Sequence, residues 1–211
     1  GVDGLFAVSQ SSEMFYLSLR ERIALARFVK NRAKIPVVAS GHISYDLTDQ
    51  IDEIRHMADT GVDAVVLVTN RISCDKENAD VWMNNLNVIL DKIDSSVSLG
   101  LYECPYPYKC LLSERELEYC ANTGRFSFLK DTCCDLVTLK RRIQVVSGTK
   151  MKLYNANSST LLSSIRAGAD GFSGIMANFH PDLYVWLMKT ISKKKRMLNV
   201  YRRYSQYVPS L

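Results

Sequence analysis

Apolar runs rich in β-branched residues recur about every 20–30 positions along the chain. Seven of these runs predict buried strands: Leu5–Ser9, Pro36–Ser40, Ala64–Thr69, Val97–Tyr102, Phe126–Asp131, Met151–Tyr154 and Gly171–Ile175. The segments between them carry apolar residues three or four positions apart, as in Ile51, Ile54 and Met57. That spacing places the apolar residues on one side of a helix, so strands and helices are predicted to alternate.

Strands that alternate with helices indicate a parallel sheet, either open or closed into a barrel. The usual nucleotide-binding versions are not favoured, because no GxGxxG or phosphate-binding glycine loop follows a strand. Polar or small residues stand at the carboxyl ends of the predicted strands: Ser9, Ser40, Thr69, Tyr102, Lys130, Asn155 and Gly174. These ends converge on one mouth in a (β/α)8 TIM barrel, which is the fold that we predict. Since a closed barrel needs an eighth strand, we expect the first strand to precede Gly1.

The chain has 211 residues, of which 47% are hydrophobic and 23% charged, enough for one large core. The net charge of +5 is concentrated near the C-terminus, where residues 189–203 contain seven basic and no acidic residues. We therefore divide the chain into a barrel over residues 1–188 and a basic helical segment over residues 189–211. A charge run of this kind is typical of a solvated helix face, and we expect no nucleic-acid partner.

Location and cofactor chemistry are constrained by what the sequence lacks. No apolar run approaches the length of a membrane span, and no signal-peptide pattern opens the chain. The six cysteines show neither a CxxC pair nor zinc-type spacing. We therefore expect reduced thiols in a cytoplasmic protein, with no membrane partner and no bound metal.

Lys130 and Tyr102 make chemical sense together. Lys130 follows the apolar run "FSFL", and Tyr102 ends "SLGLY" on the preceding predicted strand. A lysine whose pKa is lowered by desolvation can attack a ketone to form a Schiff base, and a nearby phenol can transfer the protons. The alternative is structural, since a lysine at a strand end often only reaches water.

Four motifs, in order and with similar spacing, carry a family resemblance: "GVDGLFAVSQSSEMFYLSL", "LGLYECPYPYKCLLS", "FLKDTCCDL" and "AGADGFSGIMANFHPDLY". Residues 1–187 resemble the dihydrodipicolinate synthase/N-acetylneuraminate lyase family of class I, pyruvate-dependent aldolases. The resemblance implies that Lys130 is the Schiff-base lysine and Tyr102 the catalytic tyrosine. It further implies a strand before Gly1 and more helices after the barrel.

The same resemblance implies the rest of the site. The turn that holds the keto-acid carboxylate in the family is matched by Gln10, Ser11 and Ser12, which follow Ser9. Positions that contact substrate in the family are matched by Asn155 and Gly174. The substrates would be pyruvate or another 2-keto acid and an aldehyde, with no cofactor because the imine is the electron sink. Family members are commonly homotetramers built from dimers, and we expect a homotetramer or homodimer.

Several residues depart from the family pattern. Gln10 replaces a hydroxyl of the proton relay, and Asn70-Arg71-Ile72 stands where a tyrosine pair is usual. Pro107 replaces the arginine that binds the second substrate's carboxylate in dihydrodipicolinate synthases, so aspartate semialdehyde is not the expected aldehyde. We expect His42 to lie in a surface loop, with substrate contact as the alternative.

Three other functions remain open. The same lysine imine could dehydrate a deoxy-sugar keto acid, which would require only a different second-substrate pocket. The altered relay also fits a catalytically silent barrel that binds a keto acid. A structural or nucleic-acid role depends only on the basic C-terminal segment and is the least favoured.

Overall fold

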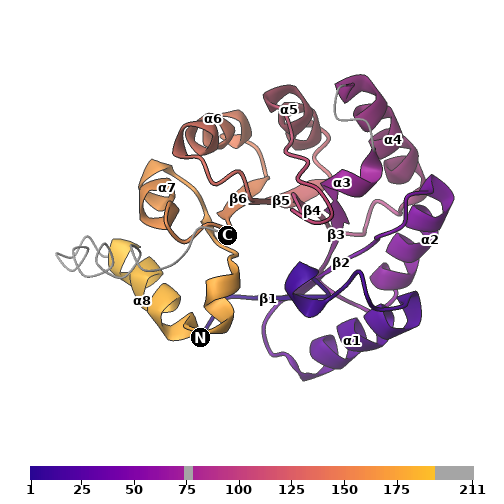
Figure 1. Cartoon of the computed structure of the whole chain (residues 1–211), viewed down its shortest axis with the longest axis horizontal. Coiled ribbons are helices and arrows are strands. Elements are labelled where there is room, and N and C mark those ends of the chain that lie inside the picture. The colour runs from indigo at the N-terminus through magenta and orange to yellow at the C-terminus, as the bar shows by residue number, and fades with distance from the viewer. Residues whose placement is uncertain (74–77, 193–211) are drawn as a thin grey trace.

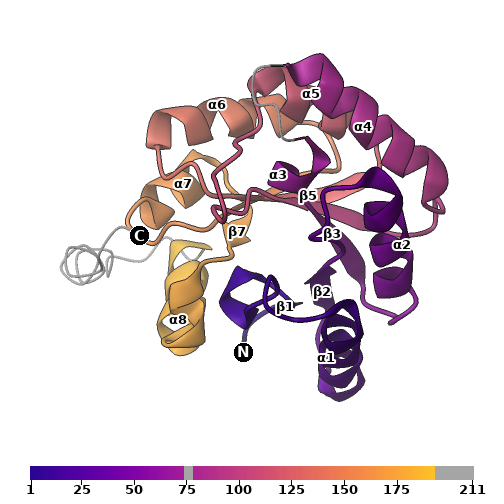
Figure 2. The ribbon, with the colours of Figure 1, turned by 45° about the vertical axis from the view of Figure 1, so that its right-hand side comes forward.

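A computed structural model describes residues 1–73 and 78–192 of the chain. Within this part the chain forms a seven-stranded parallel sheet whose strands pair in sequence order. The strands are β1 (Leu5–Ala7), β2 (Val37–Ser40), β3 (Ala64–Val68), β4 (Leu99–Tyr102), β5 (Phe126–Asp131), β6 (Lys152–Asn155) and β7 (Gly171–Phe172). The sheet curls around a central axis with the helices outside, so that β1 and α8 lie on the same side of the molecule (Figures 1 and 2).

The alternation of strands and helices is confirmed, and all seven predicted strands are present. The α-helices are α1 (Leu19–Arg32), α2 (Leu47–Ala58), α3 (Thr69–Ile72), α4 (Ala79–Lys92), α5 (Glu114–Asn122), α6 (Leu136–Val146), α7 (Leu161–Ala167) and α8 (Pro181–Ser192). Two short 3-10 helices, η1 (Gln10–Ser12) and η2 (Ile175–Asn178), follow β1 and β7. The fold is therefore TIM-barrel-like, while the strand expected before Gly1 stays a prediction.

Polar residues immediately before the helices set where several of them begin. Ser18 and Glu21 form a reciprocal capping box at the start of α1, and Ser113 and Glu116 form another at the start of α5. Asp46 accepts hydrogen bonds from the first amide groups of α2. Each of these caps satisfies amide groups that have no partner inside the helix, and each typically contributes about 1 kcal/mol.

The two faces of the sheet have different roles. Leu67, Leu101, Leu129 and Leu153 are paired in register across four neighbouring strands and are fully buried. They belong to the main hydrophobic core, which also includes residues of α2, α4, α5 and α6. Burial of each leucine contributes about 2 kcal/mol. This outer face therefore holds the helices on the sheet.

The inner face lines the interior of the curled sheet. The ring of Phe6 on β1 contacts the ring of Tyr102 on β4, with centroids 5.5 Å apart, although the two strands are not neighbours. Deeper in the interior, Phe128 packs edge-on against Tyr154. A Cβ atom on Gly100 would lie 2.4 Å from the Phe128 ring, so only glycine fits beside that ring.

Some predictions fall outside the described residues. Cys74 is one of them, and so is most of the predicted basic segment, because the described residues end at Ser192, the last residue of α8. The other five cysteines are free thiols. Within residues 1–73 and 78–192, no helix has the length and apolar character needed to cross a membrane.

Candidate active site

Lys130 and Tyr102 lie side by side at the carboxyl ends of β5 and β4. The two residues are direct partners in the parallel register, and paired residues of neighbouring strands project from the same face. The Lys130 ammonium nitrogen lies 4.5 Å from the centroid of the Tyr102 ring and 4.9 Å from that of Phe6. The predicted proximity is confirmed, whereas the catalytic roles stay predictions.

The surroundings of Lys130 favour the neutral amine. Desolvation inside the curled sheet lowers the pKa of Lys130 from 10.5 to about 8, with a smaller opposing influence from Cys104. No carboxylate of the described residues forms an ion pair with this ammonium group. Because a neutral amine has the lone pair that a nucleophile needs, the lowered pKa makes the reactive fraction of Lys130 near neutral pH far larger than that of an ordinary lysine.

Tyr102 contacts a thiol that the sequence analysis did not assign to the site. Burial raises the pKa of Tyr102 well above its usual value, and a hydrogen bond with Cys104 adds to this shift. The Cys104 thiol in turn donates to Gln10 Oε1 at 3.5 Å. Tyr102 and Cys104 are two residues apart, and this spacing is the sequence signal that could have placed them on one face. The side chains of Tyr102, Cys104 and Gln10 thus form a chain across the mouth.

The serine-rich turn after β1 lies next to this chain. Residues 10–12 form η1, and the Ser9 hydroxyl lies 2.8 Å from that of Ser11 and 3.5 Å from that of Ser12. Immediately before the turn, the buried Val8 has φ 46°, which is an uncommon conformation for a β-branched residue. This bend directs the chain from β1 into the turn that carries Gln10, Ser11 and Ser12.

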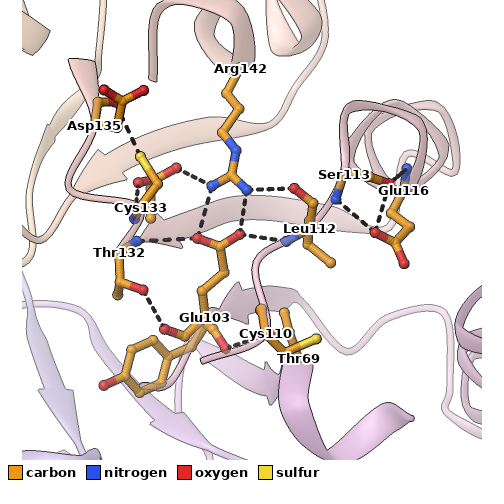
Figure 3. A network of polar contacts seen from close by, with 12 residues as sticks. Thr69, Glu103, Cys110, Leu112, Ser113, Glu116, Thr132, Cys133, Asp135 and Arg142 are labelled. Carbon is orange, nitrogen blue, oxygen red and sulfur yellow. Dashed lines mark hydrogen bonds and ion pairs between the residues drawn. The ribbon is translucent and has the colours of Figure 1, made fainter. Parts of the chain in front are cut away.

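The backbone positions of Lys130 and Tyr102 are fixed from the outer face. Each is followed by a buried carboxylate, Asp131 and Glu103, and Arg142 of α6 contacts both. Its Nη1 atom donates to Glu103 Oε2 at 2.9 Å, and its Nη2 atom forms an ion pair with Glu103 Oε1 at 2.9 Å. Figure 3 shows Arg142 directed at Glu103, with Thr132 and Leu112 on either side. Helix α6 therefore connects the ends of the two strands that carry the candidate catalytic residues.

In this outer cluster, two carboxylates, Glu103 and Asp131, pair with the single guanidinium of Arg142. Burial and the nearby Asp131 carboxylate raise the pKa of Glu103, while the Arg142 guanidinium acts in the opposite direction. Although burial opposes the charge, Glu103 and Asp131 raise the pKa of Arg142. Glu103 also accepts hydrogen bonds from the amide groups of Leu112 and Thr132. Its carboxylate is thus fully used inside the protein and does not face Lys130.

The loop after Tyr102 is held by Asn70. The Asn70 side-chain amide donates to the carbonyl groups of Cys104, Tyr106 and Tyr108 at 2.9, 3.0 and 2.7 Å. The Tyr108 hydroxyl donates back to the Asn70 carbonyl at 2.8 Å. Asn70 therefore fixes the conformation of the loop that carries Cys104.

Asn155 lies on the wrong face for the predicted substrate contact. Its amide donates to Thr160 Oγ1 at 3.0 Å and Ser164 Oγ at 2.9 Å, and its Oδ1 accepts from the Asn157 amide. These bonds join β6 to α7 on the outer side of the sheet. Gly174 lies beyond β7, where a Cβ would meet the Phe172 ring at 2.2 Å and the Ala156 carbonyl oxygen at 2.5 Å. Its smallness therefore has a packing reason.

The prediction that His42 lies in a surface loop is wrong. The side chain is fully buried, and its Nε2 atom accepts a hydrogen bond from the Val68 amide at 3.0 Å. Burial lowers the pKa of His42 to about 3, so the ring is neutral at physiological pH. Because Nε2 accepts, the ring proton is on Nδ1. His42 was misplaced because the short apolar residues around it did not distinguish a loop from a buried turn.

The described residues contain no set of side chains that could hold a metal ion. Among the described residues, no group of three or more His, Cys, Asp or Glu side chains could hold a metal ion. A depression of about 520 Å³ lies instead over α1 and His56 of α2, and it contains none of the residues discussed above. The side chains at the mouth supply an amine, a phenol, a thiol and hydroxyl groups.

Comparison of the sequence with known families and proteins agrees with this geometry. Residues 1–203 match the dihydrodipicolinate synthetase family. An uncharacterized DapA-like lyase of Pyrococcus horikoshii is 26% identical over 97% of this chain and 73% of its own length. A 4-hydroxy-tetrahydrodipicolinate synthase of Methanothrix thermoacetophila is 22% identical, and the chain spans 60% of its length.

Solved structures show the same fold. YagE of E. coli K12, crystallised in complex with pyruvate, superposes with a TM-score of 0.84 at 22% identity, over 99% of this chain and 70% of its own. The dihydrodipicolinate synthase of Acinetobacter baumannii, also complexed with pyruvate, gives a TM-score of 0.83 at 23% identity over 96% and 69% of the two chains.

Proposed function

Because the chain belongs to the dihydrodipicolinate synthetase family, whose members are lyases, we propose that it is a Schiff-base-forming lyase that cleaves or condenses a 2-keto acid with an aldehyde. The observation that carries this proposal is the desolvated Lys130 amine beside Tyr102. The pyruvate found with YagE and with the Acinetobacter enzyme supports pyruvate as the keto acid.

The first step is addition of the amine to the ketone. The Lys130 lone pair forms a bond to C2 of pyruvate, the electron pair of the carbonyl π bond moves to oxygen, and a net proton transfer from nitrogen to oxygen gives a carbinolamine. A second proton converts the hydroxyl into water, which leaves as the C=N bond forms. In condensation, loss of a C3 proton converts the imine into an enamine, whose C3 forms a bond to the aldehyde carbon while the aldehyde oxygen takes up a proton. In cleavage of a longer keto acid, the C4 hydroxyl loses its proton, the C3–C4 bond breaks with its electron pair passing to the imine, and the aldehyde leaves.

Tyr102 is the proposed proton carrier for these transfers. Its raised pKa keeps the hydroxyl protonated until a transfer occurs. Its side chain projects from the same face of the sheet as that of Lys130. The Cys104 thiol is bonded to this hydroxyl and can accept or donate a proton, which the Gln10 amide cannot do. Cys104 therefore takes the place in the relay that Gln10 leaves open.

The carboxylate of the keto acid is assigned to the turn after β1. Ser11 and Ser12 offer hydroxyl groups there, and Gln10 connects the turn to Cys104. Asn155 has no part in the proposed site, because its amide is bonded to α7. Assembly as a homotetramer or homodimer and a cytoplasmic location remain part of the proposal, by analogy with the family.

Trapping of the imine tests the proposal. Incubation with pyruvate, reduction with borohydride and peptide mass spectrometry should place one carboxyethyl group on Lys130. Lys130→Met should lose this adduct, whereas Lys152→Met, which removes an exposed lysine of the neighbouring strand, should retain it. Absence of the adduct in the wild-type protein, or its persistence in Lys130→Met, would contradict the proposed function.

A further inference from the structure

Arg71 is a buried cation that pairs with no carboxylate among residues 1–73 and 78–192. It lies in α3, directly after β3, and only 5% of its surface is exposed. Within residues 1–73 and 78–192, its side chain forms no ion pair, and its buried Nε and Nη1 atoms have no hydrogen-bond partner. An unpaired buried charge is unfavourable by several kcal/mol on general grounds, so a residue of this kind calls for an explanation.

The other two buried arginines are paired. Arg22 donates to Glu53 at 2.7 Å, and Arg142 contacts both Glu103 and Asp131. Arg22 also has two unbonded nitrogens, but its charge is compensated by the carboxylate. Arg71 is thus distinguished from both by the lack of any compensating carboxylate among the described residues.

Aromatic rings hold the Arg71 guanidinium in place. Its central carbon lies 4.9 Å from the centroid of Phe15 and 4.2 Å from that of Tyr45. Phe15 also contacts Tyr106, in the loop after the catalytic strand β4, with ring centroids 5.1 Å apart. Stacking fixes the planar group without using N–H donors, so the Nε and Nη1 atoms can still donate to another acceptor.

Arg71 is electrostatically close to the proposed reaction centre. Burial raises the pKa of Cys104, and the charges of both Lys130 and Arg71 oppose this rise. The same thiol is bonded to the Tyr102 hydroxyl. Lys130 and Arg71, which pair with no carboxylate of the described residues, therefore both influence this thiol at the mouth. A substrate with two anionic groups would compensate both regions.

On the basis of the function proposed above, we infer that Arg71 binds an anionic group on the aldehyde substrate, so that the aldehyde carries a carboxylate or a phosphate. A guanidinium can bind either group through two parallel hydrogen bonds. This arginine follows β3, whereas the family arginine that Pro107 replaces would follow β4. The two positions hold an anion at different places, so the aldehyde need not resemble aspartate semialdehyde.

Binding to the trapped enzyme tests this inference without turnover. The enzyme is first reduced with pyruvate and borohydride, which fixes the keto-acid part on Lys130. Calorimetric titration then compares 4-hydroxybutanoate with 1,4-butanediol, and glycerol 3-phosphate with glycerol. Since a hydrogen bond to a charged group contributes about 1.5–3 kcal/mol, at least one anion should bind about 10–100-fold more tightly than its neutral partner. The pair with the larger ratio identifies carboxylate or phosphate as the preferred group.

Variants assign the effect to Arg71. Arg71→Met should remove the preference for the anion, and Arg71→Lys should keep part of it. Arg20→Met removes an exposed cation of α1 and should keep the full preference. Circular dichroism and urea unfolding establish that each variant is folded before titration.

Three results would overturn the inference. One is equal affinity for anion and neutral partner in the trapped wild-type enzyme. Another is a loss of pyruvate trapping in Arg71→Met as large as its loss of anion binding, which would assign the guanidinium to the keto acid. The third is a change of anion binding in the double variant Asp75→Asn/Glu77→Gln that is as large as the loss in Arg71→Met. That result would indicate that Arg71 pairs with one of these carboxylates, outside the described residues. A failure of the trapping step itself would count against the proposed function instead.

Discussion

The two faces of strands β4 and β5 treat charge in opposite ways. On the outer face, Glu103, Asp131 and Arg142 are almost fully buried, and each is bonded to at least one opposite charge. On the inner face, the rings of Tyr102 and Phe6 lie against the Lys130 ammonium group, no carboxylate of the described residues pairs with it, and Tyr102 is bonded to a thiol. One residue step along either strand separates the two arrangements.

The difference indicates how stability and reactivity are divided. The paired charges on the outer face hold the backbone and leave no group free to react with a ligand. The inner face leaves a cation uncompensated, at a cost in stability, because a lysine paired with a carboxylate would be a poor nucleophile. At the end of each strand, a structural side chain and a reactive side chain therefore project from opposite faces of the sheet.

The largest expected effect is on the inner face. Tyr102→Phe removes the proposed proton carrier and should slow pyruvate trapping by about 10²–10⁴-fold, the usual loss for one acid–base group. The rate of adduct formation at limiting pyruvate, followed by intact-protein mass spectrometry, measures this loss. A change of less than about threefold, in a variant with unaltered unfolding, would favour a barrel that binds keto acids without catalysis.

The next effect should appear in stability. Arg142→Met leaves Glu103 and Asp131 buried without a cation and should lower the free energy of unfolding by about 3–5 kcal/mol. Arg71→Met, which removes a buried cation with no partner among the described residues, should change it by less than about 1 kcal/mol or raise it. Urea unfolding at pH 7 compares the two. Equal losses would show that Arg71 is also a structural group.

Lys130→Met should make the protein more stable at neutral pH. Because the pKa of Lys130 is lowered from 10.5 to about 8, its charge disfavours the folded state below pH 8. Partial exposure to water reduces this effect, and we expect a gain of about 1–3 kcal/mol. Between pH 8 and 10.5 the unfolded chain holds more protons, so the wild-type protein should gain stability as pH rises. The lowered pKa would be contradicted if the free energy of unfolding, measured in urea, changed equally with pH in the wild-type protein and in Lys130→Met across this range.

The smallest effect concerns a neutral bond on the outer face. Thr132 Oγ1 donates to the Glu103 carbonyl at 2.7 Å, and Thr132→Val removes this bond while preserving shape. The expected loss is about 1 kcal/mol in urea unfolding. A loss as large as that of Arg142→Met would mean that the hydroxyl, rather than the ion pairs, holds the two strands together.

Most of the fold follows from local patterns. The strands and helices were predictable because each strand is a short apolar run and each helix has one apolar side. The strand ends were less predictable: the run Gly171–Ile175 contributes only two residues to the sheet, because η2 begins at Ile175. Sequence cannot fix such ends, which depend on where the neighbouring strand stops.

The site was predictable only where residue order determines geometry. Lys130 and Tyr102 end successive strands of a parallel sheet, so their proximity could be inferred. Cys104 and Arg71 were missed, because their importance depends on contacts between loops that are distant in sequence. Asn155 was assigned to the wrong face, since its position at a strand end was considered without the alternation that directs it towards α7.

Gly100 bears on how this interior could diverge through mutation. A methyl group at position 100 would overlap the Phe128 ring, which lies two residues before Lys130 on the same face. A side chain at position 100 therefore becomes acceptable only after Phe128 has been replaced by a smaller residue. The order of these two substitutions matters. If position 100 changes first, the intermediate is strained; if Phe128 changes first, the intermediate has a cavity beneath Lys130.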